Sequence, residues 1–164
     1  MTNRYIGIDP GSLGSVAVID DYDTVLGLYD LSKNIEDYWY LTTYLQDIVG
    51  SYKESYVCVE DVCGRPGQSC AANTTFMKLA GYAELLGFFL GNFHKVKPQV
   101  WKKHFGLIFG KELSKTEKKH KSIDLAKELF PSVENQLTAS KDGRAEALLI
   151  AKYCQQIYKG EQNE

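Results

Sequence analysis

The sequence is poor in the features that mark membrane and secreted proteins. No apolar run in its 164 residues approaches the roughly 20 residues that span a bilayer. The N-terminus has no basic region followed by an apolar segment, so we expect no secretory signal, no membrane association and a cytoplasmic location. A chain of this length can build one sizeable core, and we expect a single domain over residues 1–164.

Cysteine and histidine are also scarce, and their spacing excludes several kinds of site. The four cysteines show neither Cys-x-x-Cys spacing nor a His-x-x-x-His partner. We expect Cys58 and Cys154 to be buried apolar residues rather than metal ligands. The three histidines lie among lysines, and no Ser/His/Asp or Cys/His arrangement for nucleophilic catalysis is evident.

Basic residues are rare in the first part of the chain and abundant in the middle. Residues 1–62 carry three Lys or Arg against eleven Asp or Glu, a net charge of −8, whereas residues 63–130 carry twelve against five, a net charge of +7. This segregation permits a basic, nucleic-acid-binding face on a protein whose overall net charge is −2. A solvated, lysine-rich helix explains the same pattern equally well.

Hydrophobic periodicity and turn residues predict alternating strands and helices. A basic segment over residues 111–121 is expected to be exposed, and residues 132–141 are expected to form a loop. Strands are predicted over residues 4–9, 15–19, 24–29, 55–60 and 93–96, and helices over 35–51, 74–90, 99–105, 122–130 and 142–158.

The order of these elements predicts an α/β fold of the ribonuclease H-like type. The first three strands are joined by short turns and form an antiparallel meander. The two later strands follow helices and are expected to run parallel to the first strand. The result is a five-stranded mixed sheet flanked by helices, in which the first strand is central and the last helix crosses near its end.

Acidic side chains stand at three places where an uncompensated charge is costly. Asp9 ends an apolar strand and precedes a glycine-rich turn. Glu60 ends another apolar strand and is followed by Asp61, and strand alternation allows only one of the two to point toward a given face. Asp142 and Glu146 are four residues apart, so they share one face of the last helix and repel each other unless a cation lies between them.

Three sources of carboxylates at one sheet edge can hold two hard cations through oxygen ligands. Such ions support in-line attack of water on a phosphodiester. In a purely structural interpretation, Asp9 is a turn-forming residue, Asp142 is a favourable charge at a helix N-terminus and Glu146 is solvated. Against it, Glu146 lies within the apolar run Ala145 to Ile150, where a buried carboxylate needs a partner.

The ordered set of motifs resembles the RuvC-type Holliday junction resolvases, in particular their phage and chloroplast branches. The similarity rests on Ile6-Gly7-Ile8-Asp9-Pro10-Gly11, Val59-Glu60-Asp61 and Asp142-Gly143-Arg144-Ala145-Glu146-Ala147-Leu148-Leu149-Ile150-Ala151. It extends to Pro98-Gln99-Val100-Trp101-Lys102 and to Lys121-Ser122-Ile123-Asp124-Leu125-Ala126, so it is spread over the whole chain.

This resemblance implies a homodimeric endonuclease, without a nucleotide cofactor, that makes paired nicks in four-way DNA junctions. It implies two Mg²⁺ ions, with Mn²⁺ as a substitute, and water as the nucleophile; the source would be a phage. The metal ligands carry over onto Asp9, Glu60, Asp142 and Glu146. In bacterial RuvC the last two acids are spaced Asp-x-x-Asp, whereas here they are Asp-x-x-x-Glu, and Glu146 is the firmer assignment of the two.

The resemblance also places residues against the DNA. Phe76 would be a wedge that stacks at the junction centre, although core packing explains this residue equally well. The helix over residues 79–90 would supply the dimer contact. The DNA-contacting residues expected on this basis are Arg65, Gln68, Asn73, Phe76, Lys78, Lys102, Lys103, Lys115, Lys118, Lys119 and Lys121.

Three alternatives stay open at this point. Actin-like ATPases and sugar kinases carry a similar glycine turn after a first strand, but they need two such domains, and 164 residues supply one. A non-catalytic junction-binding module would keep the fold with a vestigial site. A ribonuclease H-like nuclease acting on other branched DNA or on RNA–DNA hybrids would use the same chemistry.

Overall fold

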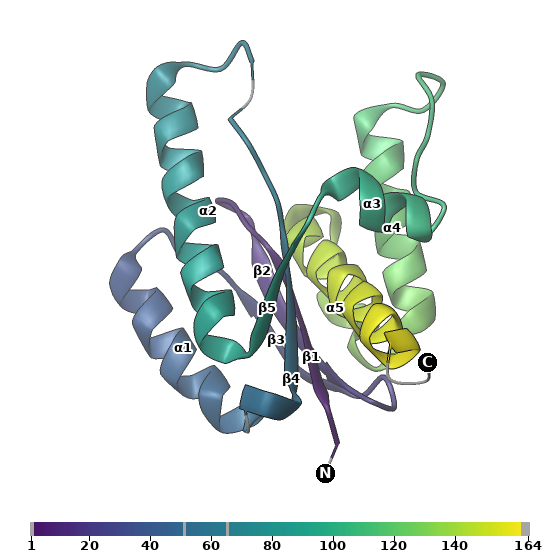
Figure 1. Cartoon of the computed structure of the whole chain (residues 1–164). Coiled ribbons are helices and arrows are strands. Elements are labelled where there is room, and N and C mark those ends of the chain that lie inside the picture. Colours follow the sequence, from purple (N-terminus) through teal and green to yellow (C-terminus); the bar gives the residue numbers. More distant parts are fainter. Residues whose placement is uncertain (1, 51, 65, 162–164) are drawn as a thin grey trace.

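The computed structural model describes residues 2–50, 52–64 and 66–161, and its centre is a five-stranded sheet (Figure 1). The strands lie in the order β3-β2-β1-β4-β5. They are β1 (Arg4–Asp9), β2 (Ser15–Asp20), β3 (Val25–Asp30), β4 (Ser55–Glu60) and β5 (Asn92–Val96). β1, β2 and β3 form an antiparallel meander, whereas β4 is parallel to β1 and β5 is parallel to β4. The predicted ribonuclease H-like sheet, with its first strand central, is confirmed.

Helices cover both faces of this sheet (Figure 1). α1 (Ile35–Val49) and α2 (Cys70–Leu90) pack on one face, and α5 (Asp142–Glu161) packs on the other, with α3 (Pro98–His104) and α4 (Lys115–Leu129) outside it. Three short 3-10 helices complete the chain at Tyr52–Glu54, Pro131–Gln136 and Ala139–Lys141. Among the described residues, no helix combines the length and the apolar character needed to cross a membrane.

Alternation along the strands divides the core into two clusters. On β1, Ile6 and Ile8 join the cluster under α1 and α2, whereas Tyr5 joins the cluster under α5. On β4, Val57 and Val59 face α2, and Cys58 faces α5. Because successive side chains of a strand point to opposite faces, this alternation also fixes which face the residues at the strand ends point to.

Two helices begin earlier than the sequence predicted, and both begin at a serine cap. α2 starts at Cys70, four residues before the expected start, because the Ser69 side chain accepts a hydrogen bond from the Ala72 amide (3.2 Å). α4 starts at Lys115, seven residues before the expected start at 122, and so includes residues 115–121 of the segment expected only to be exposed. Ser114 and Glu117 form a capping box there, a signal that was present in the sequence.

Gly7, in the middle of β1, lies directly under the backbone of α5. A Cβ atom at this position would lie 2.1 Å from the Ala147 carbonyl oxygen and 2.2 Å from the Ala151 amide nitrogen. Only the absence of a side chain therefore lets the backbone of α5 rest on the central strand. This contact sets the height of α5 above the end of β1.

We expect Gly7→Ala to lower the free energy of unfolding by about 3 kcal/mol or more, because neither backbone atom can move without displacing α5. Gly64→Ala is the matched control, since the nearest atom that a Cβ there would meet is Asn73 Oδ1 at 3.6 Å, an ordinary contact distance. That variant should be as stable as the wild type or more stable by about 0.4–1 kcal/mol. Urea unfolding of both variants measures the difference, and equal stabilities would contradict this account of the contact.

Candidate metal centre

Strand parity places two carboxylates on the face that α5 covers. Asp9 is in the same alternation as Tyr5 and Gly7, and Glu60 is in the same alternation as Cys58. β1 and β4 are parallel neighbours, so both strands end on the same side of the sheet. The two side chains therefore approach each other under the start of α5.

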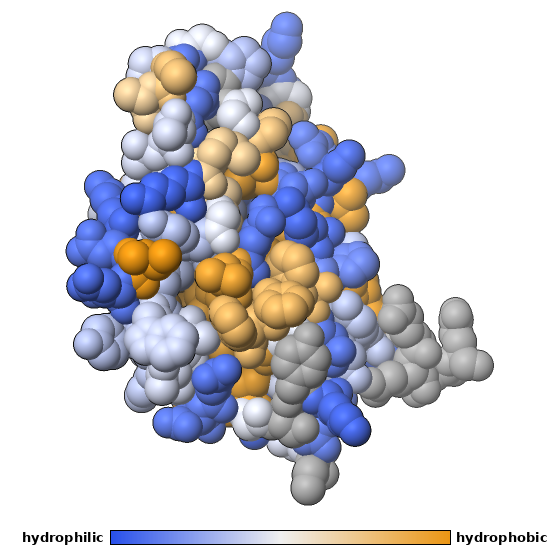
Figure 2. All heavy atoms as spheres, turned by 60° about the vertical axis from the view of Figure 1, so that its left-hand side comes forward, coloured by the Kyte–Doolittle hydropathy of each residue, from blue (hydrophilic) through white to orange (hydrophobic). Residues whose placement is uncertain are grey.

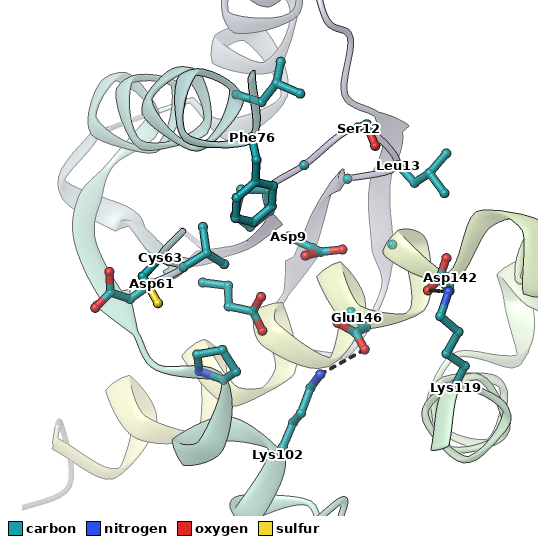
Figure 3. A pocket seen from close by; sticks show the side chains of 18 of the residues that line it. Asp9, Ser12, Leu13, Asp61, Cys63, Phe76, Lys102, Lys119, Asp142 and Glu146 are labelled. Carbon is teal, nitrogen blue, oxygen red and sulfur yellow. Dashed lines mark hydrogen bonds and ion pairs between the residues drawn. The ribbon is translucent and has the colours of Figure 1, made fainter. Parts of the chain in front are cut away.

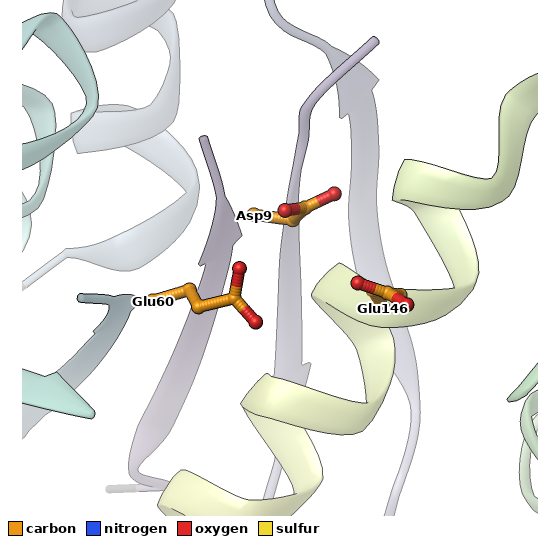
Figure 4. A group of neighbouring side chains, drawn as sticks. All are labelled: Asp9, Glu60 and Glu146. Carbon is orange, nitrogen blue, oxygen red and sulfur yellow. The ribbon is translucent and has the colours of Figure 1, made fainter. Parts of the chain in front are cut away.

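The third carboxylate comes from the second turn of α5. Glu146 faces Asp9 and Glu60 from this helix, and one oxygen atom from each of the three side chains lies within 4.8 Å of the other two (Figure 4). Gly143 lets the first turn of this helix come close, since a Cβ there would lie 3.1 Å from Asp9 Oδ2. Three elements far apart in sequence thus bring three carboxylates to one point.

Asp142, the fourth predicted ligand, lines the same cleft but stands apart from this group in the described part of the chain. Its Oδ2 atom lies 2.7 Å from Lys119 Nζ on α4 (Figure 3). The ion pair links the first residue of α5 to α4. Helical spacing correctly put Asp142 and Glu146 on the same side, but it did not indicate this partner.

Asp61 is separated from the cluster, as alternation requires. Its Oδ1 atom pairs with Lys95 Nζ at 2.9 Å, and Figure 3 shows its carboxylate directed away from Asp9 and Glu146. The Asp61 amide donates to the Val96 carbonyl oxygen at 2.7 Å, which holds the end of β4 against β5. Of the two adjacent acids, Glu60 is therefore the one that belongs to the candidate site.

The concentration of negative charge shows in the ionisation of Asp9. Part of its side chain is accessible at the floor of the cleft, yet protein atoms withdraw it from bulk water. This desolvation, followed by repulsion from Glu146 and Glu60, raises the pKa of the Asp9 carboxyl well above its usual value, although Lys102 opposes the shift. A cation placed among the three carboxylates would offset both effects.

Two consecutive residues of α3 provide the hydrogen-bond donors of the site. The indole Nε1–H of Trp101 donates to Glu60 Oε1 at 2.9 Å, in a fully buried contact. Lys102 Nζ lies 3.1 Å from Glu146 Oε1 (Figure 3). Sequence reasoning assigned Lys102 to phosphate and gave Trp101 no role. Its place in the motif Pro98-Gln99-Val100-Trp101-Lys102 was the available signal.

The carboxylates form the floor of an open cleft of about 1410 Å³. One wall is the β1–β2 turn, residues 10–14, and another is the first half of α2 with Phe76. Phe76 is half-buried and faces the turn, because a Cβ at Gly11 would lie 3.6 Å from its ring. Basic residues of α3 and α4 form the opposite rim: Lys102, Lys115, Lys118 and Lys119.

The predicted DNA-contacting residues distribute unevenly around this cleft. Gln68, Phe76, Lys102, Lys115, Lys118 and Lys119 line it. Asn73, Lys78, Lys103 and Lys121 are described but are not part of its lining, and Lys78 lies 5.5 Å from the centre of the Tyr82 ring on α2. Arg65 falls outside the described residues. The contacts themselves stay predictions.

The donor set fits a hard divalent cation. All three converging side chains offer carboxylate oxygen, the ligand that Mg²⁺, Mn²⁺ and Ca²⁺ prefer. Glu60 and Glu146 each accept a hydrogen bond from α3, and such outer donors orient ligating carboxylates in metal proteins. Asp9, Glu60 and Glu146 can therefore hold a divalent ion, and Asp142 stands one helical turn away.

Comparisons with known proteins bear on the fold. No protein-family model and no curated protein sequence matches this chain. Among solved structures, RuvC of T. thermophilus in complex with a Holliday junction substrate superposes with a TM-score of 0.62 at 13% identity, over 98% of this chain and 96% of that one. A Thermus thermophilus RuvC structure gives 0.53 at 14% identity, over the same shares of the two chains. The chain therefore has a RuvC-like fold.

The raised pKa of Asp9 predicts a pH-dependent stability in the absence of metal. The folded state keeps the Asp9 proton to a higher pH than the unfolded chain, whose Asp pKa is about 3.9. The fold therefore loses stability as pH rises from that value through the raised pKa. Asp9→Asn removes this loss, so the metal-free variant should melt above the wild type at neutral pH.

The advantage of Asp9→Asn should shrink as pH falls toward 4, because the folded wild type then keeps Asp9 protonated and the unfolded chain, with a pKa of about 3.9, becomes increasingly protonated as well. Asp61→Asn is the matched control and should show no such gain, since it loses only the contact with Lys95. Thermal melts in EDTA across pH 4–8 measure both. An Asp9→Asn effect that is independent of pH would contradict the electrostatic account.

Proposed function

We propose that this protein is an endodeoxyribonuclease that resolves four-way DNA junctions by metal-dependent phosphodiester hydrolysis. The observation that carries the proposal is the position of three carboxylates within 4.8 Å of one another on the floor of a lysine-rimmed cleft. The RuvC-like fold supports it, because one similar structure holds a Holliday junction substrate. Asp9, Glu60 and Glu146 are the proposed core ligands, and Asp142 is the proposed fourth.

The chemistry would follow from these ligands. Two bound Mg²⁺ ions would lower the pKa of a water molecule and stabilise the leaving oxygen of the phosphodiester. The chain supplies the ligands from two strand ends and one helix, so their separation is set by the packing of α5 on the sheet. Lys102 neutralises part of the charge at Glu146, which lets a phosphate enter beside three carboxylates.

The lysines on α4 would receive the DNA backbone. Lys115, Lys118 and Lys119 line the cleft on the side opposite Phe76. Contacts of this kind give affinity that falls steeply with salt and carry no sequence information. Lys119 has to exchange Asp142 for a phosphate when DNA binds, since the two side chains pair at 2.7 Å in this structure. That exchange would release Asp142 toward the metal site.

A homodimer would give the two active sites that paired nicking needs, and α2 offers a surface for it. Its outward face carries Met77, Leu85, Phe88 and Phe89, which are 41%, 50%, 58% and 45% exposed. Figure 2 shows this apolar surface on the side of the molecule formed by α1 and α2, rimmed by polar side chains. Contiguous exposed apolar patches of this kind mark protein interaction sites. We propose that α2 packs against α2 of a second copy.

The decisive test is cleavage of a labelled, immobile four-way DNA junction beside linear duplex and an RNA–DNA hybrid, with and without Mg²⁺. We expect symmetric paired nicks in the junction alone. Asp9→Asn should retain junction binding and lose cutting by about 100-fold or more, because it removes a ligand of the ions that stabilise the transition state. Asp61→Asn is the matched control and should cut like the wild type.

The outcomes of this test separate the alternatives. Cutting of the hybrid in place of the junction would keep the metal site and replace the resolvase by a ribonuclease H-like activity. Tight junction binding without cutting in Mg²⁺ or Mn²⁺ would identify a non-catalytic binding module. Unaltered cleavage by Asp9→Asn would remove the proposed centre altogether.

The dimer has its own test. Leu85→Glu should raise the dimer dissociation constant by about 100-fold or more, because burying an uncompensated carboxylate costs several kcal/mol. Tyr22→Glu is the control, since Tyr22 is 79% exposed and lies at the β2–β3 turn, away from α2. Sedimentation velocity distinguishes the two states. A Leu85→Glu protein that is as dimeric as the wild type would place the interface elsewhere.

A further inference from the structure

The hydrogen bond from Trp101 to Glu60 is the most buried polar contact of the site. Trp101 is 0% exposed and Glu60 is 7% exposed, and the donor and acceptor are 2.9 Å apart. A buried indole N–H needs an acceptor, and it can only donate. Phe could fill the same apolar pocket, but it has no N–H to donate to Glu60. The contact therefore links a core residue directly to a carboxylate of the candidate metal centre.

We propose that Trp101 is a positioning residue that fixes the orientation of the Glu60 carboxylate for a divalent cation. The inference rests on the proposed function only in assuming that Asp9, Glu60 and Glu146 bind metal; it assumes nothing about DNA. A glutamate has three rotatable bonds, and one buried hydrogen bond to Oε1 restricts the last of them. Ligating carboxylates in metal proteins are held by such outer partners.

The surroundings of Trp101 make this donor rigid. α3 begins with Pro98, separated from the end of β5 by one residue, and the Asp61 amide is bonded to the Val96 carbonyl oxygen at 2.7 Å. The residue after Glu60 is thus tied to the strand that leads into the Trp101 helix. The helix ends with hydrogen bonds from the Phe105 amide to the Trp101 carbonyl oxygen (3.3 Å) and from the Leu107 amide to that of Lys102 (2.7 Å).

Lys102 contacts both the Trp101 ring and the Glu146 carboxylate. Its Nζ atom lies 4.9 Å from the centre of the Trp101 ring and 3.1 Å from Glu146 Oε1. The ammonium group is attracted to the face of the indole ring, so this contact helps to hold the ring in place. Two adjacent residues of one seven-residue helix therefore orient two different carboxylates.

Mn²⁺ affinity of the DNA-free protein, measured from the EPR signal of the free ion, tests the proposal. Trp101→Phe keeps an aromatic ring and removes the N–H, and we expect binding to weaken about 10- to 100-fold. Trp39→Phe, in a residue 67% exposed on α1, is the control and should bind like the wild type. Unchanged affinity of Trp101→Phe would overturn the proposal.

A double-mutant cycle separates positioning from a general loss of packing. Glu60→Ala removes the acceptor, so adding Trp101→Phe to it should cause no further loss of Mn²⁺ affinity. If Trp101→Phe weakens binding by the same factor with and without Glu60, its effect does not pass through Glu60 and the proposal fails.

A second measurement leaves Trp101 intact and so does not depend on how its variant folds. The chain has two tryptophans, and in ¹⁵N-labelled Trp39→Phe the one remaining indole N–H signal belongs to Trp101. That signal should shift and saturate during a Mg²⁺ titration, and the shift should vanish in the Glu60→Ala background. No shift at full metal occupancy would refute the positioning role. Because DNA is absent from these measurements, their outcome does not depend on whether the protein cleaves junctions.

Discussion

The contact between α5 and the central strand governs the rest of the structure. Gly7 has no side chain to keep the helix backbone away from β1, and Ala147 and Ala151 present their backbone to it. Because the helix lies so low, its first two turns reach the strand ends, where Asp9 and Glu60 stand. The same helix carries Glu146 into the group and Asp142 to its margin. The candidate site is thus a consequence of one backbone contact in the core.

The fold tolerates a local instability at this point. Three carboxylates converge where desolvation and repulsion raise the pKa of Asp9, and the partners around them are a neutral indole and a lysine. A protein selected for stability alone would not place the charges there. The remainder of α5 compensates, since residues 147–151 are completely buried in the larger of the two core clusters. The helix that brings Glu146 to Asp9 and Glu60 is therefore anchored in the core by its next turn.

The cleft joins two surfaces of different chemistry. Phe76 and the β1–β2 turn form an apolar side, and α4 forms a basic side, with the carboxylates between them. The uneven distribution of charge along the sequence corresponds to this geometry. The acidic first part of the chain supplies Asp9 and Glu60, and the basic middle supplies the lysines of the opposite rim. An overall net charge of −2 therefore hides a cleft with both signs.

Local patterns in the sequence determined the strands, the order of the elements and the residues that stand at their ends, because periodicity and turn chemistry are short-range properties. Together with the resemblance to RuvC-type resolvases, they predicted the central first strand and the four acids Asp9, Glu60, Asp142 and Glu146, and they left the choice between Glu60 and Asp61 open. The starts of α2 and α4 were missed although the serine caps were readable. Only the tertiary structure decided between Glu60 and Asp61, paired Asp142 with Lys119 and brought the Trp101 indole to Glu60. Each of those outcomes depends on how elements about 20 or more residues apart pack together, or on the face to which a strand end points. Tertiary packing sets these distances and directions.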